Sequence, residues 1–549
     1  MKALQYARFA LACALLFAFV WSESPSLSSR LAHINIQMLY VGKSIAFIAA
    51  YIALFVALVL LALSSKRVFK WSVALLLGVS CLCVDVFYRA SGGKVMEYID
   101  FVILYQAKAN ALDALMQYAD MIYASLPRTL ALLLGFALMP SRFTPLSERV
   151  RVAGGGGIIC LLIAFTSVVC VYRQGAATNK LPSPTSPIAL SLAYLYDSLS
   201  TPRPAYTYTT ESKPTNKPLF THIVLIVDES LRWDYSPFLR VKTPPDSKYK
   251  VLDYGRASSG ANCSHTSNIM LRKGAKSSAV AHDFYANAFL WSYARNAGYK
   301  THLYDAQGGG GGHDFFTTQE RELIDVNLSN TAIKQDSDII DSLSYLNDST
   351  PSFTYIIKKG SHFPYHAPFL AKPSDDYTKA NHQRILYLSN VIYQSDVFFT
   401  KLLSQHYAQK VLFIYTSDHG QNLFDRAGLT HCTAGSEPYD GEGEVPLVLI
   451  SNGDVARYEA HLAKNCNRAS HFNIAPTILE AMGYDEGDRS GSDVPLSRDS
   501  AYLGGFFYGV PFGLFGKQPD FYTLQSEPTK SQCKAKEADK ILPPKGVAQ

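Results

Sequence analysis

Charged residues are scarce in this sequence, and the shortage is uneven along the chain. Asp, Glu, Lys and Arg make up 17% of the 549 residues, and hydrophobic residues make up 48%. Soluble proteins average about 25% charged residues. The first third is the apolar part, and the whole chain is longer than one hydrophobic core supports. The composition therefore excludes a wholly soluble single domain and predicts a membrane region followed by a soluble one.

The sequence also lacks a strong net charge, a long internal repeat and a cleavage signal. Its formal net charge is +6 and its isoelectric point is about 8.6. This mild basic balance suits an anionic membrane surface and does not indicate a nucleic-acid partner. No compelling small-x-small cleavage site precedes Pro25, so we expect the N-terminal apolar stretch to remain as an anchor.

Five apolar stretches in the first third are candidates for membrane-spanning helices. They cover about residues 9–21, 44–64, 71–88, 121–140 and 153–172. The second and fifth carry no charge over roughly the 20 residues that a bilayer core requires. Asp85 and Arg128 make the third and fourth weaker candidates. We predict five spans, which form an α-helical transmembrane bundle.

Basic residues in the short loops predict the orientation of this bundle. Lys and Arg occur at three places, residues 2–8, 66–70 and 142–151. With five alternating spans all three places lie on one side, which the positive-inside rule assigns to the cytoplasm. Everything after about residue 175 is then expected on the opposite face of the membrane.

Two segments differ from the spans around them. Residues 98–120 are amphipathic but too polar to span, so we expect an interfacial helix on the outer face. Residues 175–218 are rich in Pro, Ser and Thr, which is typical of a linker. The predicted organisation is a transmembrane domain over residues 1–174, a linker over 175–218 and a soluble domain over 219–549.

Short apolar runs alternate with helical stretches from residue 220 onward. The runs "HIVLIVDES", "SFTYIIKKG", "KVLFIYTSDHG" and "VPLVLISNG" are rich in Val and Ile, as strands buried on both faces are. This alternation predicts an α/β domain with a mostly parallel sheet.

Acidic and imidazole side chains follow three of these runs at the point where each ends. They are Asp228, Glu229, His362, Asp418 and His419, with His431 close behind. Sites in open α/β sheets form beyond the carboxyl ends of strands, so we expect these side chains to share one site. Together they offer enough oxygen and nitrogen donors for one or two zinc ions.

The stretch "SSGANCSHTSN" at residues 258–268 precedes a predicted helix. Within five positions it holds Cys263, Ser264, Thr266 and Ser267. Hydroxyl groups in such a turn can cap the helix, and one that is activated by a neighbouring group can be a nucleophile. From these residues alone both interpretations stay open.

Several motifs in the soluble part resemble those of one enzyme family. "SDHG" at 417–420 is followed by His431 and then by a Val-Pro pair before a strand, and "GSHFP", "VDESLRWDY" and "AGYKTHLYDAQGG" resemble the remaining motifs. In motif order and in its apolar first third, the chain resembles the membrane-anchored phosphoethanolamine transferases of the alkaline phosphatase/sulfatase superfamily. The resemblance covers most of the chain and implies an alkaline phosphatase/sulfatase-like fold for the soluble domain.

The resemblance also implies a role for individual residues. Ser264 matches the family's Thr nucleophile at the start of a helix, with Thr266 as the runner-up. The residues that match the ligands of the primary zinc ion are Glu229, Ser264, Asp418 and His419. His362 and His431 match a pair that binds a second zinc ion or the transferred phosphate. The residues expected to surround and orient the ligands, without binding the metal themselves, are Asp228, Ser267 and His471.

Four cysteines fall in the soluble domain, where an oxidising compartment permits disulfides. They are Cys263, Cys432, Cys466 and Cys533, which can pair in three ways. The sequence does not choose between these pairings, and a free thiol as a zinc ligand also stays open. Cys263 does not match a sulfatase-type cysteine, because the Cys-x-Pro/Ala-x-Arg pattern is absent.

These expectations describe a metal-dependent transferase of the bacterial inner membrane. It would take phosphoethanolamine from phosphatidylethanolamine onto Ser264 and pass it to an envelope glycolipid or glycan, with lipid A or a core sugar of lipopolysaccharide as the expected acceptor. The sequence departs from the family at Gln421, at Ile357, at the glycines of 308–312 and at "HFPY", and the last departure favours a phosphoglycerol transferase. A sulfatase or phosphatase is a further candidate, and so is a non-catalytic membrane sensor.

Overall fold

A computed structural model of the chain divides into two compact units, one built on residues up to Pro202 and the other on residues from Arg203. The structure describes residues 2–23, 41–91, 93–106, 115, 118–141, 146–175, 182–200, 204–244, 247–307, 316–329, 333, 335–362, 365, 379–426, 430–434, 438–487, 493–509, 515, 519–525, 533 and 535–536. Several segments with sequence-based predictions lie outside this set: Arg142, most of the interfacial segment from 107 to 117, parts of the linker and the glycines of 308–312.

The first unit contains five helices that are long and apolar enough to cross a membrane. They are α1 (Lys2–Trp21), α3 (Val41–Ala62), α4 (Arg67–Ala90), α7 (Ala119–Leu138) and α8 (Glu148–Tyr172). The prediction of five apolar helices is confirmed. Three shorter elements complete the described part of this unit: α5 (Tyr98–Gln106), the 3-10 turn η4 (Ser183–Thr185) and α9 (Ser186–Ser200).

The two charges that weakened the third and fourth stretches pair with each other. Nη1 of Arg128 on α7 lies 2.6 Å from Oδ1 of Asp85 on α4, and both side chains are buried. Nε of Arg128 donates to the carbonyl oxygen of Phe19. A charge inside a membrane is costly unless it is paired within the protein, so this ion pair explains how α4 and α7 accommodate their charged residues.

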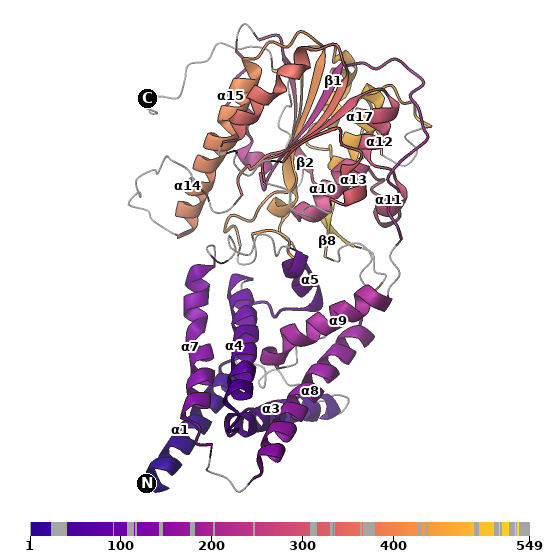
Figure 1. Cartoon of the computed structure of the whole chain (residues 1–549). Coiled ribbons are helices and arrows are strands. Elements are labelled where there is room, and N and C mark those ends of the chain that lie inside the picture. Colours follow the sequence, from indigo (N-terminus) through magenta and orange to yellow (C-terminus); the bar gives the residue numbers. More distant parts are fainter. Residues whose placement is uncertain are drawn as a thin grey trace. The chain divides into compact units, whose positions relative to one another are not determined.

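The second unit is built on an eight-stranded mixed sheet (Figure 1). Its strand order is β10-β2-β7-β6-β1-β5-β3-β4. The strands are β1 (His222–Asp228), β2 (Lys250–Ser258), β3 (Lys300–Asp305), β4 (Val326–Ser329), β5 (Ser352–Ile357), β6 (Val411–Ser417), β7 (Glu444–Ser451) and β10 (Ala535–Lys536), and β8 (Gly505–Tyr508) pairs with β9 (Asp520–Thr523) in a second sheet.

The five strands from β6 to β4 are parallel, as predicted. The edge formed by β7, β2 and β10 is antiparallel. The run "VPLVLISNG" that forms β7 therefore belongs to the sheet but runs in the opposite direction to its neighbour β6. Apolar composition identifies a buried strand without giving its direction.

Helices cover both faces of this sheet, so every residue of β1 is buried. Ile223, Leu225 and Val227 face one hydrophobic core, to which α10 (Ser264–Lys273), α12 (Leu290–Asn296) and α17 (Ile474–Ala481) contribute. Val224 and Ile226 face the other core, to which α14 (Lys379–Val391) and α15 (Val397–Leu403) contribute. The remaining elements are α11 (Val280–Ala286), α13 (Thr318–Arg321), α16 (Ala456–Asn465), the 3-10 segments η5 (Trp233–Tyr235), η6 (Pro237–Leu239), η8 (Asp336–Asn347), η10 (Asp440–Glu442) and η11 (His471–Asn473), and the π segment η9 (Ile392–Asp396).

The register of the sheet brings three strand ends together. β1 lies between β5 and β6, with Val227 opposite Ile357 and Asp228 opposite Ser417. The segments that follow these three strands therefore start side by side at the carboxyl edge of the sheet, which is where sites form in folds of this kind.

Candidate active site

The residues that follow β1 and β6 form a compact group of oxygen and nitrogen donors. Glu229, Asp418 and His419 are all buried, and one potential ligand atom from each lies within 4.8 Å of the others. Asp418 is fixed by the backbone around it, because its Oδ1 accepts from the amides of Ser230 (2.9 Å) and His419 (2.7 Å). The predicted ligands of the primary zinc ion thus lie together.

The imidazole of His419 presents one nitrogen to this group. Its Nδ1 lies 2.6 Å from the carbonyl oxygen of Gly420, which can only accept, so Nδ1 carries the proton. Nε2 then carries the lone pair of the ring, and it lies 3.5 Å from Asp418 Oδ2 and 3.8 Å from Glu229 Oε1. Position 420 requires glycine, because a Cβ there would come within 2.1 Å of the Gly441 carbonyl oxygen. A backbone carbonyl that fixes the tautomer is the usual support of a metal-binding histidine.

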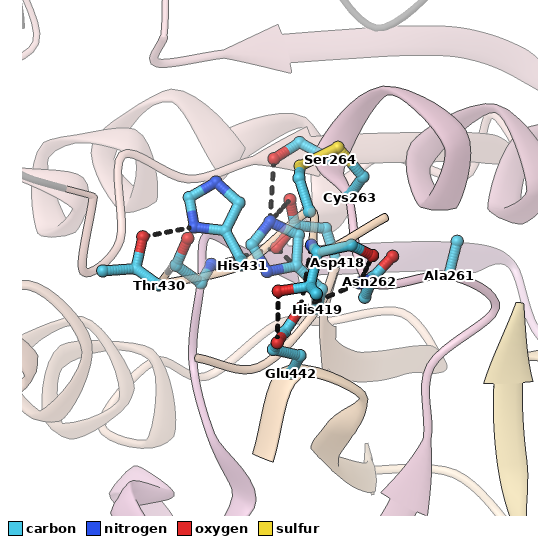
Figure 2. The surroundings of a disulfide bond; sticks show 12 residues. Ala261, Asn262, Cys263, Ser264, Asp418, His419, Thr430, His431 and Glu442 are labelled. Atoms are coloured by element: carbon cyan, nitrogen blue, oxygen red, sulfur yellow. Dashed lines mark hydrogen bonds and ion pairs between the residues drawn. A yellow bond between two sulfur atoms is a disulfide. The ribbon is translucent and has the colours of Figure 1, made fainter. Parts of the chain in front are cut away.

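Ser264 brings a hydroxyl to the same point. It is the first residue of α10, with Cys263 as the N-cap. Its Oγ lies 2.9 Å from Nε2 of His419 and 3.4 Å from Oε1 of Glu229 (Figure 2). The amides of a helix N-terminus favour negative charge, so this position suits a hydroxyl that becomes an oxyanion. Thr266, the runner-up, lies two residues further along α10 and is half-buried.

Glu229 is oriented through both of its carboxylate oxygens. Oε1 accepts from Ser230 Oγ (2.7 Å), and Oε2 accepts from Gln307 Nε2 (2.9 Å). Burial by itself would raise the pKa of Glu229, but the nearby His362 and the hydrogen bond from Ser230 outweigh it and hold the pKa below its usual value. The carboxylate is therefore ionised at neutral pH, as a metal ligand must be.

His431 and His362 lie beside this group. The ring of His431 stacks on that of His419, with centroids 4.5 Å apart, and its Nδ1 lies 3.2 Å from Thr430 Oγ1. Burial and the neighbouring His419 lower the pKa of His431 to about 3. His362 follows the turn after β5 and is half-buried, and its positive charge lowers the pKa of Glu229. The ring of His431 thus lies against the ligand group, and the roles of both imidazoles stay predictions.

A disulfide joins the two segments that carry Ser264 and His431. Cys263 bonds to Cys432 across 169 residues of sequence, and Cys466 bonds to Cys533. The amide of Cys432 also donates to the Asn262 carbonyl oxygen (2.8 Å). Figure 2 shows this bridge next to Ser264. Because all four cysteines of this unit are in disulfides, the hypothesis of a free thiol as a zinc ligand is wrong.

Ser267 and His471 form hydrogen bonds that link the start of α10 to the segment carrying Asp418. Ser267 Oγ donates to the carbonyl oxygen of Asp418 and lies 3.3 Å from His471 Nδ1. Nδ1 of His471 accepts from the Gly260 amide (3.0 Å), so Nε2 carries the proton and donates to Thr416 (3.0 Å). Burial lowers the pKa of His471 to about 3. A neutral, buried His471 therefore ties the start of α10 to β6.

Asp228 turns away from the ligand group. Its Oδ2 accepts from Lys358 Nζ (2.6 Å), Ser395 Oγ (2.7 Å) and Tyr415 OH (2.8 Å). Ile357, where the family often has a histidine, is a buried core residue at the end of β5. Gln421 Nε2 donates to Tyr365 OH (2.8 Å) and does not enter the ligand group.

Sequence reasoning overlooked several residues that orient the ligands. Ser230 occupies a left-handed conformation (φ 56°) directly after Glu229, which turns its hydroxyl and amide toward Glu229 and Asp418. Gln307 follows β3, in the "DAQGG" segment that carried one of the motifs. Its place after a parallel strand is the signal that could have identified it.

The donors fit a zinc ion. Zinc takes about four oxygen, nitrogen or sulfur ligands. The site offers two carboxylates, one imidazole nitrogen and one hydroxyl oxygen close to one another. They belong to Glu229, Asp418, His419 and Ser264. The tautomer of His419 and the low pKa of Glu229 leave these two donors in the form that binds a cation.

A family model gives the relationship of this unit to known proteins, since the model described as "Sulfatase" matches residues 221–484. The matched region contains the whole ligand group, Ser264 and both flanking histidines. Comparison with curated protein sequences returns no significant match.

Solved structures resemble this chain in fold at low sequence identity. The integral membrane protein lipooligosaccharide phosphoethanolamine transferase A from Neisseria meningitidis is 15% identical, with a TM-score of 0.50, and the match covers 88% of this chain and 95% of that one. The C-terminal periplasmic domain of EptC from Escherichia coli is 16% identical, with a TM-score of 0.45, over 60% of this chain and 99% of that one. A second structure of that domain is a complex with Zn, at 16% identity, a TM-score of 0.44 and the same coverage. The likeness to the Neisseria protein shows the fold, an N-terminal helical membrane region followed by a sulfatase-like α/β domain.

Proposed function

We propose that this protein transfers phosphoethanolamine from phosphatidylethanolamine to an envelope glycolipid or glycan, with lipid A or a core sugar of lipopolysaccharide as the acceptor. The observation that carries the proposal is the position of the Ser264 hydroxyl at the N-terminus of α10, 2.9 Å from His419 and 3.4 Å from Glu229. A hydroxyl beside a cation-binding group is the arrangement of an activated nucleophile. The Neisseria protein with the same fold is, by its name, a lipooligosaccharide phosphoethanolamine transferase.

The first half-reaction forms a covalent intermediate on Ser264. Its Oγ bonds to the phosphorus of the donor lipid, and the bond from phosphorus to the diacylglycerol oxygen breaks. The hydroxyl proton of Ser264 ends on that diacylglycerol oxygen. The amides at the start of α10 favour the negative charge that develops near Oγ. Phosphoethanolamine then remains on Ser264 as a phosphodiester.

The second half-reaction restores the enzyme. An acceptor hydroxyl or phosphate oxygen bonds to phosphorus, the bond between Ser264 Oγ and phosphorus breaks, and a proton returns to Oγ. We assign His362 and His431 to the transferred phosphate or to a second zinc ion, because both lie around the ligand group. Both steps are displacements at phosphorus, for which positioning and electrostatic stabilisation do most of the work.

Glu229, Asp418, His419 and Ser264 would hold the zinc ion. When bound, zinc lowers the pKa of a coordinated hydroxyl and stabilises negative charge on phosphoryl oxygens. The residues around the ligands keep them in place: Gly420 fixes the tautomer of His419, and Ser230 and Gln307 fix the carboxylate of Glu229.

The membrane unit fits a lipid donor. The head group of a phospholipid lies at the bilayer surface, so a tethered catalytic domain can reach it without extracting the lipid. We place the chain in the bacterial inner membrane with the sulfatase-like domain in the periplasm, on the basis of the basic residues at 2–8, 66–70 and 142–151. The predicted limits of the domains, 1–174, 175–218 and 219–549, remain part of this proposal.

Phosphoglycerol transfer is the second candidate, favoured by the sequence His-Phe-Pro-Tyr at 362–365. Mass spectrometry of envelope glycolipids and glycans, with and without the gene, distinguishes the two functions. Our proposal expects a glycolipid whose mass falls by one phosphoethanolamine group when the gene is deleted. A loss of phosphoglycerol would favour the second candidate, and unchanged glycolipids and glycans would contradict both.

A further inference from the structure

A buried lysine lies directly behind the ligand group. Lys358 follows β5, its side chain has no exposed surface, and its backbone amide continues the pairing with β1 by donating to the Val227 carbonyl oxygen (2.9 Å). Its Nζ donates to Asp228 Oδ2 (2.6 Å) and to Ser395 Oγ (2.6 Å), and it lies 3.7 Å from Asp336 Oδ2. A buried charge requires partners, and here one ammonium group serves two buried carboxylates.

Each of these two carboxylates also accepts hydrogen bonds from backbone amides at or near a predicted ligand. Asp228 Oδ1 accepts from the amide of Glu229 (3.2 Å). Asp336 accepts from the amides of Lys359 (2.8 Å) and Gly360 (3.0 Å), which lead into the turn before His362. The ammonium group of Lys358 is therefore the common partner of the two anchors, one for Glu229 and one for the His362 turn.

The turn and Glu229 are also joined directly. The amide of Ser361 donates to the carbonyl oxygen of Glu229 (3.1 Å). Gly360 has φ 55°, and a Cβ at this position would come within 2.4 Å of Asp228 Oδ1 and 2.5 Å of the Glu229 amide. The turn thus packs so closely against the Asp228 carboxylate that position 360 has no room for a side chain.

The backbone of Lys358 contributes a third link. Gln307 Nε2 donates both to Glu229 Oε2 and to the Lys358 carbonyl oxygen, each at 2.9 Å. The amide that orients the Glu229 carboxylate is therefore positioned by Lys358. Lys358 thus contacts both Asp228, which accepts from the Glu229 amide, and Gln307, which donates to the Glu229 carboxylate, without entering the ligand group itself.

We propose that Lys358 is a positioning residue of the zinc site, acting through Asp228, Asp336 and Gln307 to hold Glu229 and the His362 turn in the geometry that binds the ion. This inference rests on the proposed function, because it presupposes a zinc ion at Glu229. Residues that orient metal ligands typically change metal affinity 10- to 100-fold when they are replaced.

The test measures zinc affinity of the full-length protein in detergent by competition with a chelator. Replacing only Lys358 leaves Asp228 and Asp336 buried without their counter-charge, which can prevent folding. The main variant is therefore the neutral pair Asp228→Asn with Lys358→Met, made together with Asp336→Asn so that no buried carboxylate loses its counter-charge. It is supported by Asp228→Asn alone, which keeps Lys358 beside Asp336. Lys359→Met is the matched control, because it makes the same lysine change one residue along, where Nζ of the half-buried lysine lies 3.5 Å from the Ile333 carbonyl oxygen.

We expect the main variant to bind zinc 10- to 100-fold more weakly than the wild type, and Asp228→Asn to show a loss in the same direction. The control should stay within twofold. The melting temperature of the zinc-free protein, measured in parallel, separates positioning from a purely structural role, which would lower that temperature and leave the affinity of the folded protein unchanged. Zinc affinity of the main variant within twofold of wild type would overturn the inference alone. A wild-type protein that binds no zinc would overturn the proposed metal site as well.

Discussion

The hydroxyl oxygen of Ser264 and Nε2 of His419 lie 2.9 Å apart, although 155 residues separate them in the sequence. One starts the helix that follows β2, and the other follows β6 at the carboxyl edge of the parallel strands. Their contact places a candidate nucleophile against a ligand group that also contains Glu229 and Asp418. The predictions below test what this contact implies.

The first prediction concerns metal content. Elemental analysis of the full-length protein should find at least one zinc ion per chain. Asp418→Ala should reduce zinc to near zero, because it removes a carboxylate from a site of about four ligands. Thr266→Ala serves as the control and should keep its zinc, because Thr266 lies two residues further along α10 than Ser264. A wild-type protein that folds without zinc would contradict the metal-dependent mechanism.

The second prediction compares the two disulfides. Replacing both Cys263 and Cys432 by Ser should abolish head-group transfer, because this bridge joins the residues next to Ser264 and His431. Replacing both Cys466 and Cys533 by Ser should leave transfer largely intact. By restricting the unfolded chain, the two disulfides should stabilise the fold by similar amounts. The loop-closure entropy corresponds to about 5 kcal/mol for a separation of 169 residues and about 4 kcal/mol for 67 residues.

Because their effects on the free energy of unfolding should be similar, the second pair controls for stability. Transfer activity and the unfolding free energy would be measured on both variants. Equal loss of activity in the two would show that the first bridge acts through stability and has no particular role in positioning the site.

The third prediction concerns pH. The pKa of His471 is about 3 in the folded protein, against 6.5 for an ordinary histidine, and burial is the main cause. Between these values the unfolded chain binds a proton that the folded one does not, so stability falls as the pH drops below 6.5. The slope from one such group is at most about 1.4 kcal/mol per pH unit.

His471→Gln should therefore flatten the loss of unfolding free energy between pH 6.5 and pH 4, measured by chemical denaturation of the zinc-free protein. His406→Gln is the control, because this ring is exposed in the folded protein and meets water in both states. The same slope in His471→Gln as in the wild type would mean that His471 is charged when folded.

The fourth prediction concerns topology. A reporter that is active only in the periplasm should work when fused after residue 180 and fail when fused near residue 68. The reason is the cluster of Lys66, Arg67 and Lys70 at the start of α4, which the positive-inside rule keeps in the cytoplasm. The opposite pattern of activities would reverse the orientation and remove the sulfatase-like domain from the periplasm.

The parts of this fold that could be predicted from sequence are those with strong local patterns. Apolar stretches of about 20 residues predicted the five membrane helices, and Val- and Ile-rich runs predicted β1, β5, β6 and β7. Strand direction at the β7 edge and the pairing of Cys263 with Cys432 depend on contacts between distant segments, which composition and periodicity do not report.

The candidate site divides in the same way. Residues at strand ends, such as Glu229, Asp418 and His419, carry their own signal, because strand ends meet at one edge of the sheet. Gln307 and Lys358 act through geometry: one bridges Glu229 to a backbone carbonyl, and the other is buried between two carboxylates. A lysine in "IIKKG" looks like an ordinary polar residue after a strand, and only the packed structure shows what it contacts.

The central claim is that Ser264 carries the transferred group, and the mass of the intact protein tests it most directly. The full-length protein would be supplied with phosphatidylethanolamine in the absence of an acceptor. We predict a mass increase of one phosphoethanolamine group, which peptide mapping places on Ser264. Ser264→Ala should form no adduct while it keeps zinc through Glu229, Asp418 and His419, and Ser264→Thr should still form one. An adduct on Thr266 would contradict the assignment of Ser264, and a fully active Ser264→Ala protein without any adduct would contradict the covalent mechanism itself.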